Sequence, residues 1–207
     1  MVEAVKKKKS KNKFVPFIDR DEWDDIDPIE QYEGGIAPIA PIPYPEEYVE
    51  IMGYFRAILK KDEISQRAFN LTEEVIFHSM GNYTAWHYRR RCLDELKLPL
   101  EDEIKWLQTH GLRMEKNYQI WHHRRCIAEI LAEKLDTASE MDFLDKIFDS
   151  DTKNFHAWSY RVWLIERFQL WDGELDFCNK LMDADVFNNS LWSYRYFLLS
   201  RSPSGTY

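Results

Sequence analysis

Apolar residues after Pro45 recur at helical spacing. A first hairpin is predicted by apolar positions three and four residues apart: Tyr48, Ile51, Met52, Phe55, Ile58 and Leu59 in one helix, Ala68, Leu71, Val75 and Ile76 in the next. From Asn82 onward, further helices are expected over residues 82–96, 100–113, 117–134, 139–150, 154–169, 173–183 and 188–200. No stretch of alternating β-branched residues indicates a strand, so the pattern predicts an all-α chain.

One motif, Asn-aromatic-x-x-Trp-x-x-Arg, recurs along these helices. Its positions are Asn82, Trp86 and Arg89; Asn117, Trp121 and Arg124; Asn154, Trp158 and Arg161; and, without the aromatic residue, Asn188, Trp192 and Arg195. The copies begin 35, 37 and 34 residues apart. A period near 35 residues is typical of stacked helical hairpins. We therefore predict an α-α superhelix, a solenoid of hairpins, over residues 46–207.

The motif residues have a structural interpretation. Asn is a good N-cap, so Asn82, Asn117 and Asn154 are expected to cap their helices. Trp and the Arg three residues later share one helical face, and packing between hairpins is the simplest role for both. Ser139, followed by Asp142, is a weaker candidate for a helix cap.

The N-terminal quarter of the chain differs from the rest. Residues 1–13 carry six Lys against one Glu, and we interpret them as a disordered basic tail, with a targeting or membrane-surface signal as the alternative. Residues 14–45 mix aromatic with acidic residues and end in Gly34, Gly35 and four prolines. They are predicted to form an irregular arm laid along a surface.

Composition narrows the class of protein. The 207 residues have a net charge of -8, and about -13 outside the tail, which argues against nucleic-acid binding. No apolar run is long enough for a membrane span, and no secretory signal is visible. The three cysteines lack metal or disulfide spacing, so a reducing cytoplasm is the expected location.

Sequence motifs of hydrolases, nucleotide-binding proteins and redox proteins are absent. His122 and His123 are adjacent, so they point about 100° apart on a helix and do not chelate one metal; we predict no metal site on this chain. Lys116 precedes a motif helix, where a cation is unfavourable unless an anion meets it. Lys116 is therefore either a solvated lysine or, with Tyr118 and His156, part of a phosphate site.

The stretch K-N-Y-Q-I-W-H-H-R-R (116–125) resembles the signature of the α subunit shared by protein farnesyltransferase and type I protein geranylgeranyltransferase. The similarity extends through D-R-D-E-W-D-D-I-D-P (19–28), Y-F-R-A-I-L-K-K-D-E (54–63) and N-F-H-A-W-S-Y-R (154–161), and covers about residues 14–200.

The resemblance implies an α subunit that is active only as a heterodimer with a β subunit. That β subunit holds the catalytic Zn²⁺, and Mg²⁺ accompanies the diphosphate. The complex transfers farnesyl or geranylgeranyl from its diphosphate to the Cys thiol of a C-terminal C-a-a-X sequence.

The resemblance also implies roles for individual residues. Lys116 would stabilise the departing diphosphate, with Tyr118 beside the reacting end of the isoprenoid. Gln119 would hold the peptide carboxylate. Asn154, His156 and Tyr83 would line the same edge.

Two departures from the family pattern are visible. Phe155 stands where Tyr is common, so any hydrogen bond from that hydroxyl is absent. Little sequence follows the fourth motif, so either a partner covers that end or the chain is a shortened form. The alternatives are the α subunit of Rab geranylgeranyltransferase and a non-catalytic helical-repeat scaffold or truncated form.

Overall fold

The computed structural model describes residues 14–32 and 40–202. The chain divides into two compact units, Met1–Ser79 and Met80–Tyr207. All regular structure within the described ranges is helical, which confirms the predicted all-α class. The basic tail predicted at residues 1–13 lies outside the described residues, as do Gly34, Gly35 and Pro38 of the predicted arm.

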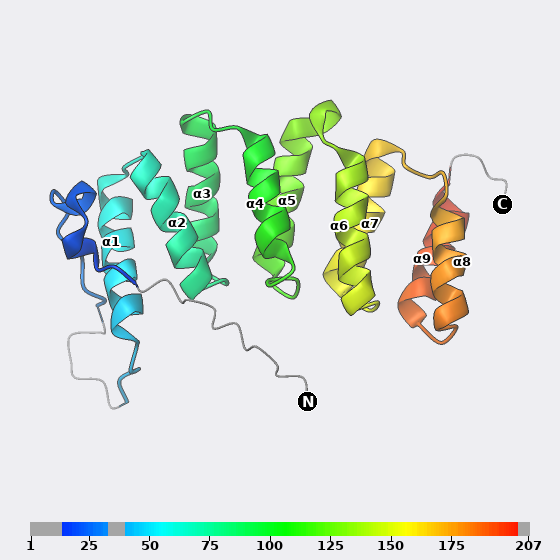
Figure 1. Ribbon diagram of the computed structural model, residues 1–207, viewed down its shortest axis with the longest axis horizontal. Coiled ribbons are helices and arrows are strands. Elements are labelled where there is room, and N and C mark those ends of the chain that lie inside the picture. The colour runs from blue at the N-terminus through cyan, green and yellow to red at the C-terminus, as the bar shows by residue number, and fades with distance from the viewer. Residues whose placement is uncertain (1–13, 33–39, 203–207) are drawn as a thin grey trace, which may run out of the picture. The chain divides into compact units, whose positions relative to one another are not determined.

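The first unit contains a helical hairpin (Figure 1). Helix α1 (Glu46–Lys61) begins directly after Pro45 and ends at Asp62, whose backbone is left-handed with φ 50°. Helix α2 (Gln66–His78) begins after Ser65, whose side-chain oxygen accepts the backbone N–H of Ala68. Both helices lie where the apolar periodicity predicts them.

The N-terminal arm packs on this hairpin through apolar side chains. It forms two short 3-10 turns, η1 (Phe17–Asp19) and η2 (Asp21–Trp23). Phe17, Trp23 and Ile26 are buried, and the Phe17 ring stacks on Tyr54 of α1 with centroids 4.5 Å apart. The arm therefore covers one side of the α1–α2 hairpin.

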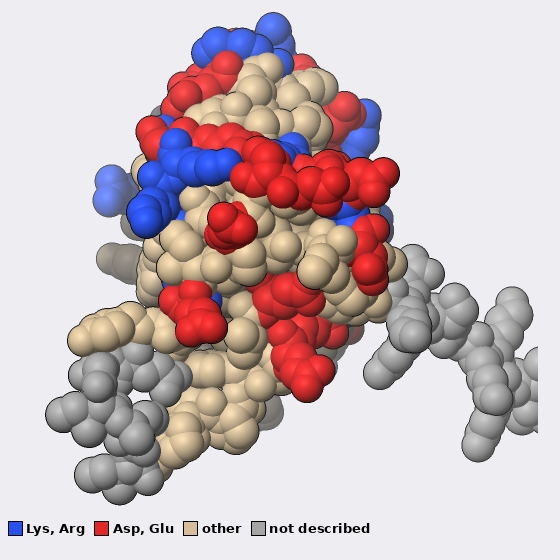
Figure 2. All heavy atoms as spheres, turned by 90° about the vertical axis from the view of Figure 1, so that its left-hand side faces the viewer, with Lys and Arg blue, Asp and Glu red and all other residues tan. Residues whose placement is uncertain are grey.

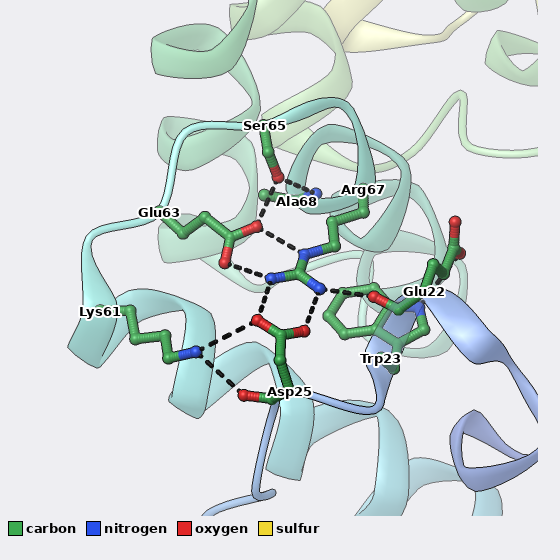
Figure 3. Close-up of polar contacts among 8 residues, drawn as sticks. All are labelled: Glu22, Trp23, Asp25, Lys61, Glu63, Ser65, Arg67 and Ala68. Atoms are coloured by element: carbon green, nitrogen blue, oxygen red, sulfur yellow. Dashed lines mark hydrogen bonds and ion pairs between the residues drawn. The ribbon is translucent and has the colours of Figure 1, made fainter.

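Hydrogen bonds from Arg67 of α2 also connect the arm to the hairpin (Figure 3). Its guanidinium donates to the carboxylate of Asp25 and the carbonyl oxygen of Glu22 in the arm, and to the carboxylate of Glu63 before α2. Lys61 of α1 donates to the Asp25 carbonyl oxygen at 3.1 Å. The hydrogen bonds from Arg67 hold the pKa of Asp25 well below its usual range.

The side of the molecule that carries the arm and α1 is strongly acidic. Figure 2 shows Asp and Glu side chains gathered over it, with fewer Lys and Arg side chains between them.

The second unit is built from two rows of helices. The motif helices are α3 (Tyr83–Glu95), α5 (Tyr118–Leu131), α7 (Phe155–Phe168) and α9 (Asn189–Arg201). They pack side by side in chain order, and α4 (Leu100–Gly111), α6 (Thr137–Ser150) and α8 (Glu174–Ala184) pack against α5, α7 and α9 respectively (Figure 1). The motif helices α5 and α7 therefore each contact the motif helices one repeat before and one repeat after them.

Two details of the helix prediction are wrong. Helix α6 begins at Thr137, because the carboxylate of Asp136 accepts the backbone N–H of Ser139; Asp136, not Ser139, is the N-cap. Helix α5 ends at Leu131, and a separate 3-10 turn η3 (Ala132–Lys134) follows it. No helix in the described part of the chain has the length and apolar character needed to cross a membrane.

Candidate functional site

Each motif helix begins with the same turn, built by its Asn and Trp. The side-chain oxygens of Asn82, Asn117 and Asn154 accept first-turn backbone N–H groups, so the three predicted caps are confirmed. The indole N–H donates to the carbonyl oxygen six residues earlier, at 2.8 Å for Trp86, 2.7 Å for Trp121, 2.9 Å for Trp158 and 2.7 Å for Trp192. The motif therefore fixes the turn before the helix as well as the helix start.

A second hydrogen bond to the same carbonyl oxygens joins the turns of adjacent repeats. The Glu115 carbonyl oxygen accepts from the Trp121 indole and, at 3.3 Å, from the Asn154 side-chain amide of the next repeat. Asn188 repeats this contact on the carbonyl oxygen of Thr152 at 3.2 Å. Lys116 follows Glu115 directly, so hydrogen bonds from two repeats fix the backbone next to Lys116.

Lys116 projects from this turn into solvent. Its side chain is 75% exposed, and its ammonium group lies 3.3 Å from a carboxylate oxygen of Asp151 in the turn before α7. Sequence reasoning missed Asp151. The recurrence of Asp before a motif Asn, at Asp151 and Asp185, was the available signal, and Lys153 lies 3.8 Å from Asp185 in the same way.

Tyr118 lies two residues after Lys116, and its ring contacts His156 of the next motif helix. Tyr118 is 66% exposed, and its ring stands edge-on to the imidazole of His156, with centroids 4.3 Å apart and an interplanar angle of 80°. Burial lowers the pKa of His156, so its imidazole is neutral near pH 7. Phe155 packs against the other edge of His156 and remains largely exposed. An exposed ammonium group, a phenol and a neutral imidazole on two adjacent helix N-termini suit an oxyanion.

The other predicted site residues differ from Lys116 and Tyr118, and from one another, in how far they are exposed. Gln119 is only 9% exposed, so its side chain is largely covered within the subunit. Asn154 is buried, and both ends of its side chain make intramolecular hydrogen bonds. Tyr83 lies at the first position of α3 and is exposed.

A cavity opens next to Phe155, between α7 and α9. Its volume is about 580 Å³, and its lining includes Lys153, Phe155, Trp158, Val162 and Tyr194. The lining also includes Ser159, Ser190 and Ser193, so apolar, hydroxyl and cationic groups face one space, which suits a ligand with both an apolar and an anionic part.

The motif arginines are buried ion-pair partners. Arg89, Arg124 and Arg161 each make a two-point contact with a glutamate of the following helix, with shortest distances of 2.7 Å to Glu103, Glu140 and Glu174. Each glutamate also accepts from the next motif helix, through His123, Tyr160 and Tyr194. This network confirms the structural interpretation of these arginines and ties successive motif helices together.

His122 and His123 point apart, as predicted from their adjacency. His123 is fully buried against Glu103, whereas His122 is partly exposed with its Nε2 3.6 Å from the Cys126 sulfur. Burial lowers the pKa of both imidazoles. Among the described residues, no group of three or more His, Cys, Asp or Glu side chains is arranged to hold a metal ion.

The helical repeats of the chain match a known family model. The model for the protein prenyltransferase alpha subunit repeat matches residues 65–96, 100–131, 137–168 and 171–202, which together make up more than half of the chain. The chain belongs to this family. Each family repeat thus pairs a preceding helix with one motif helix, and the fourth ends with α9.

Relatives of this family member are α subunits of prenyltransferases. The shared farnesyltransferase/geranylgeranyltransferase type-1 α subunit of Arabidopsis thaliana is 46% identical over 45% of this chain and 28% of its own length. That of Candida albicans is 40% identical over 64% of this chain and 45% of its own length. A geranylgeranyltransferase type-2 α subunit of Dictyostelium discoideum is 29% identical over 58% of this chain.

A solved structure shares the fold. Candida albicans protein geranylgeranyltransferase-I complexed with GGPP matches with a TM-score of 0.81 and 39% identity, over 88% of this chain and 63% of that chain. This match confirms the predicted α-α superhelix fold class. The chain spans less than half the length of the two type-1 relatives named above.

Proposed function

We propose that this chain is the α subunit of a heterodimeric protein prenyltransferase of the farnesyltransferase and type-1 geranylgeranyltransferase class. The observation that carries the proposal is the exposed pair Lys116 and Tyr118 at the start of one motif helix, with the Tyr118 ring against His156 of the next. The names of the type-1 relatives support it. We place the activity in the cytoplasm.

The proposed reaction transfers an isoprenoid to a C-terminal C-a-a-X cysteine. A carbon–sulfur bond forms at C1 of farnesyl or geranylgeranyl diphosphate while the C1–oxygen bond breaks, and the bonding electron pair leaves with the diphosphate. Negative charge on the departing oxygen therefore increases in the transition state. A positioned cation is worth on the order of 2–4 kcal/mol in such a step.

Lys116 supplies this cation. Its present partner, Asp151, is a surface carboxylate, and exposed ion pairs of this kind contribute only about 0–1 kcal/mol. Exchange of Asp151 for a diphosphate therefore costs little. The two contacts on the Glu115 carbonyl oxygen keep the Lys116 backbone in place during the exchange.

The neighbouring residues orient the substrates. The Tyr118 phenol and the neutral His156 imidazole offer hydrogen bonds beside the reacting end of the isoprenoid. We assign the peptide carboxylate to Gln119 through the 9% of this residue that remains exposed, and Tyr83 extends the same edge by one repeat. Asn154 acts through the turn that it fixes, because its own side-chain groups are already bonded.

We assign both metals of the reaction to other molecules. We assign the Zn²⁺ to the β subunit, where it would activate the thiol when bound. Mg²⁺ accompanies the diphosphate. No step in our proposal uses a metal ligand from this chain.

The type-2 class is the second candidate. We favour the type-1 class because the type-1 relatives named above are 40% and 46% identical, against 29% for the type-2 relative. Co-expression with each class of β subunit, followed by size-exclusion chromatography, tests this choice. Co-elution with a type-1 or farnesyltransferase β subunit supports the proposal, whereas co-elution with the type-2 β subunit alone contradicts it.

A further inference from the structure

Another cavity opens between α3 and α5, at the opposite end of α5 from Lys116. Its volume is about 310 Å³. Five apolar side chains from α3, the loop after α3, the start of α4 and the end of α5 line it: Leu93, Leu98, Leu100, Ile127 and Ile130. Arg90, Asp94 and Lys97 complete the lining. This cavity, called the α3–α5 cavity below, therefore combines a mostly apolar wall with three charged side chains.

The end of α3 shapes one wall of the α3–α5 cavity. Lys97 has a left-handed backbone with φ 53°, and the backbone N–H of Leu98 donates to the carbonyl oxygen of Leu93 at 3.1 Å. This is the geometry of a Schellman motif, which turns the chain back and brings the apolar residue after the helix against its last turn. Leu93 and Ile127 are 3% and 1% exposed. Packing within the folded repeats therefore fixes the apolar wall.

Ile130 leaves part of this apolar surface in water. It lies in the last turn of α5, is 66% exposed, and also lines a neighbouring cavity of about 650 Å³. An alkyl chain in the α3–α5 cavity would cover a side chain that the helices of the second unit leave exposed. Removal of this apolar area from water favours binding.

Arg90 is a cation without a counter-charge. It is partly buried, and its guanidinium lies 3.5 Å from the Nδ1 of His123. Among the described residues, no carboxylate lies within ion-pair distance of Arg90, whereas the next residue, Arg91, pairs with Glu95. A partly buried guanidinium is stabilised by an anion, and the chain as a whole, with a net charge of -8, leaves this one unmatched. The α3–α5 cavity is therefore suited to an anionic ligand.

The other two charged residues of the cavity compensate each other. Lys97 donates to a carboxylate oxygen of Asp94 at 3.1 Å. The cavity thus has one uncompensated positive charge, on Arg90. A guanidinium binds a carboxylate through two parallel N–H groups, so a single carboxylate balances this charge, whereas a phosphate dianion would leave an excess of negative charge.

We propose that the α3–α5 cavity binds a single-chain amphiphile with a carboxylate head, a molecule of the fatty-acid class. The carboxylate pairs with Arg90, and the alkyl chain lies against Leu93, Leu98 and Ile130. The proposed prenyl transfer uses none of these residues, so the two proposals are independent.

Isothermal titration calorimetry of the full 207-residue chain with decanoate, below its critical micelle concentration, tests the proposal. We expect saturable binding of one decanoate per chain. Decyl maltoside has the same alkyl chain with an uncharged head and should bind about tenfold more weakly, because it lacks the charge-assisted hydrogen bonds. Acetate and decyltrimethylammonium should show no saturable binding, and decyl phosphate should bind no more tightly than decanoate.

Matched substitutions locate the ligand on the chain. Arg90→Gln should weaken decanoate binding about tenfold and leave decyl maltoside binding unchanged. Arg113→Gln, at an exposed arginine after α4, should change neither. Ile130→Ser should weaken both amphiphiles several-fold, whereas Leu112→Ser, at an exposed leucine outside the cavity, should not. Circular dichroism would verify that each variant retains its helical content.

Several results would overturn the proposal. Absence of saturable decanoate binding is the first, and equal affinity for decanoate and decyl maltoside is the second. Equal effects of Arg90→Gln and Arg113→Gln would remove the ion pair from the account, and tighter binding of decyl phosphate would contradict the carboxylate head. If Arg90→Gln lost helical content, Ile130→Ser would decide, because unchanged decanoate binding in that variant places the ligand outside the α3–α5 cavity.

Discussion

The side-chain amide of Asn154 donates to the carbonyl oxygen of Glu115 at 3.3 Å. This bond joins the turn that carries Lys116 to the next motif helix, and the Asn154 side-chain oxygen caps that helix at the same time. One buried residue therefore links the stability of a repeat to the position of the candidate catalytic lysine.

Two substitutions of Asn154 should separate these roles. Asn154→Ala removes both the helix cap and the hydrogen bond to Glu115. Loss of the cap should lower the free energy of unfolding by about 1 kcal/mol. For a chain of this size that lowers Tm by about 2–4 °C. Asn154→Asp keeps a capping oxygen but has no amide donor, so we expect a smaller change in Tm and a lower turnover in the reconstituted heterodimer. Equal turnover of Asn154→Asp and the unmodified chain would show that the link does not position Lys116.

Lys116→Ala should lower kcat by on the order of ten- to a thousand-fold, because it removes about 1.5–4 kcal/mol of transition-state stabilisation. Lys105→Ala is the matched control, since Lys105 is similarly exposed and also faces an aspartate, Asp102, away from the site. Steady-state kinetics with a C-a-a-X peptide measures both. Similar losses for the two variants would indicate a general effect of charge and remove the specific role of Lys116.

His123 should make stability depend on pH. Its Nε2 lies 2.8 Å from Glu103 of α4, and Arg90 of α3 lies 3.5 Å from its Nδ1, with Arg89 on the same glutamate. These contacts fit a neutral imidazole whose Nε2–H donates to Glu103. Burial lowers the pKa of His123, so below about pH 6.5 the unfolded chain binds a proton that the folded chain does not.

The free energy of unfolding should therefore decrease as pH falls from about 6.5 toward 5. His123→Tyr introduces the residue found at the equivalent positions 160 and 194, where the phenol donates to Glu140 and Glu174. We expect a smaller slope in this variant, measured by urea unfolding at several pH values. Some slope should remain, because the pKa values of His122 and His156 are also lowered by burial. An unchanged slope would mean that His123 titrates alike in both states.

Arg67→Gln should release the arm from the α1–α2 hairpin. The substitution removes the contacts to Asp25 and to the carbonyl oxygen of Glu22, which hold the arm together with the hydrogen bond from Lys61 to Asp25. Trypsin cleavage after Arg20 should become several-fold faster. Arg91→Gln, which breaks an exposed pair with Glu95 in the second unit, serves as the control. Equal cleavage rates in both variants would show that the buried Phe17 and Trp23 hold the arm without Arg67.

The repeat period and the caps could be predicted because they depend on local chemistry. An Asn that caps its own helix, such as Asn117, is visible within a few residues of sequence. Ser139 was misassigned because Asp136, three residues earlier, accepts the backbone N–H of Ser139 and so starts the helix before it. Helix boundaries depend on such local alternatives, whereas helix existence depends on the whole apolar stripe.

The buried pairing partners were not predicted because they lie on other helices. Nothing within the motif indicates that Arg124 pairs with Glu140, or that Lys116 faces Asp151. A glutamate three residues before an aromatic residue, at Glu103, Glu140 and Glu174, was a usable signal, since it recurs at nearly the same distance after Arg89, Arg124 and Arg161. Gln119 illustrates the remaining difficulty, because its exposure depends on packing that no single helix specifies.

The most direct test of the central claim is the rate of prenyl transfer to a C-a-a-X peptide by this chain co-purified with a farnesyltransferase or type-1 β subunit, compared with either subunit alone. We predict turnover by the complex only, with a thioether product detected by mass spectrometry. A stable complex without transfer, or no complex with either β subunit, would contradict the account.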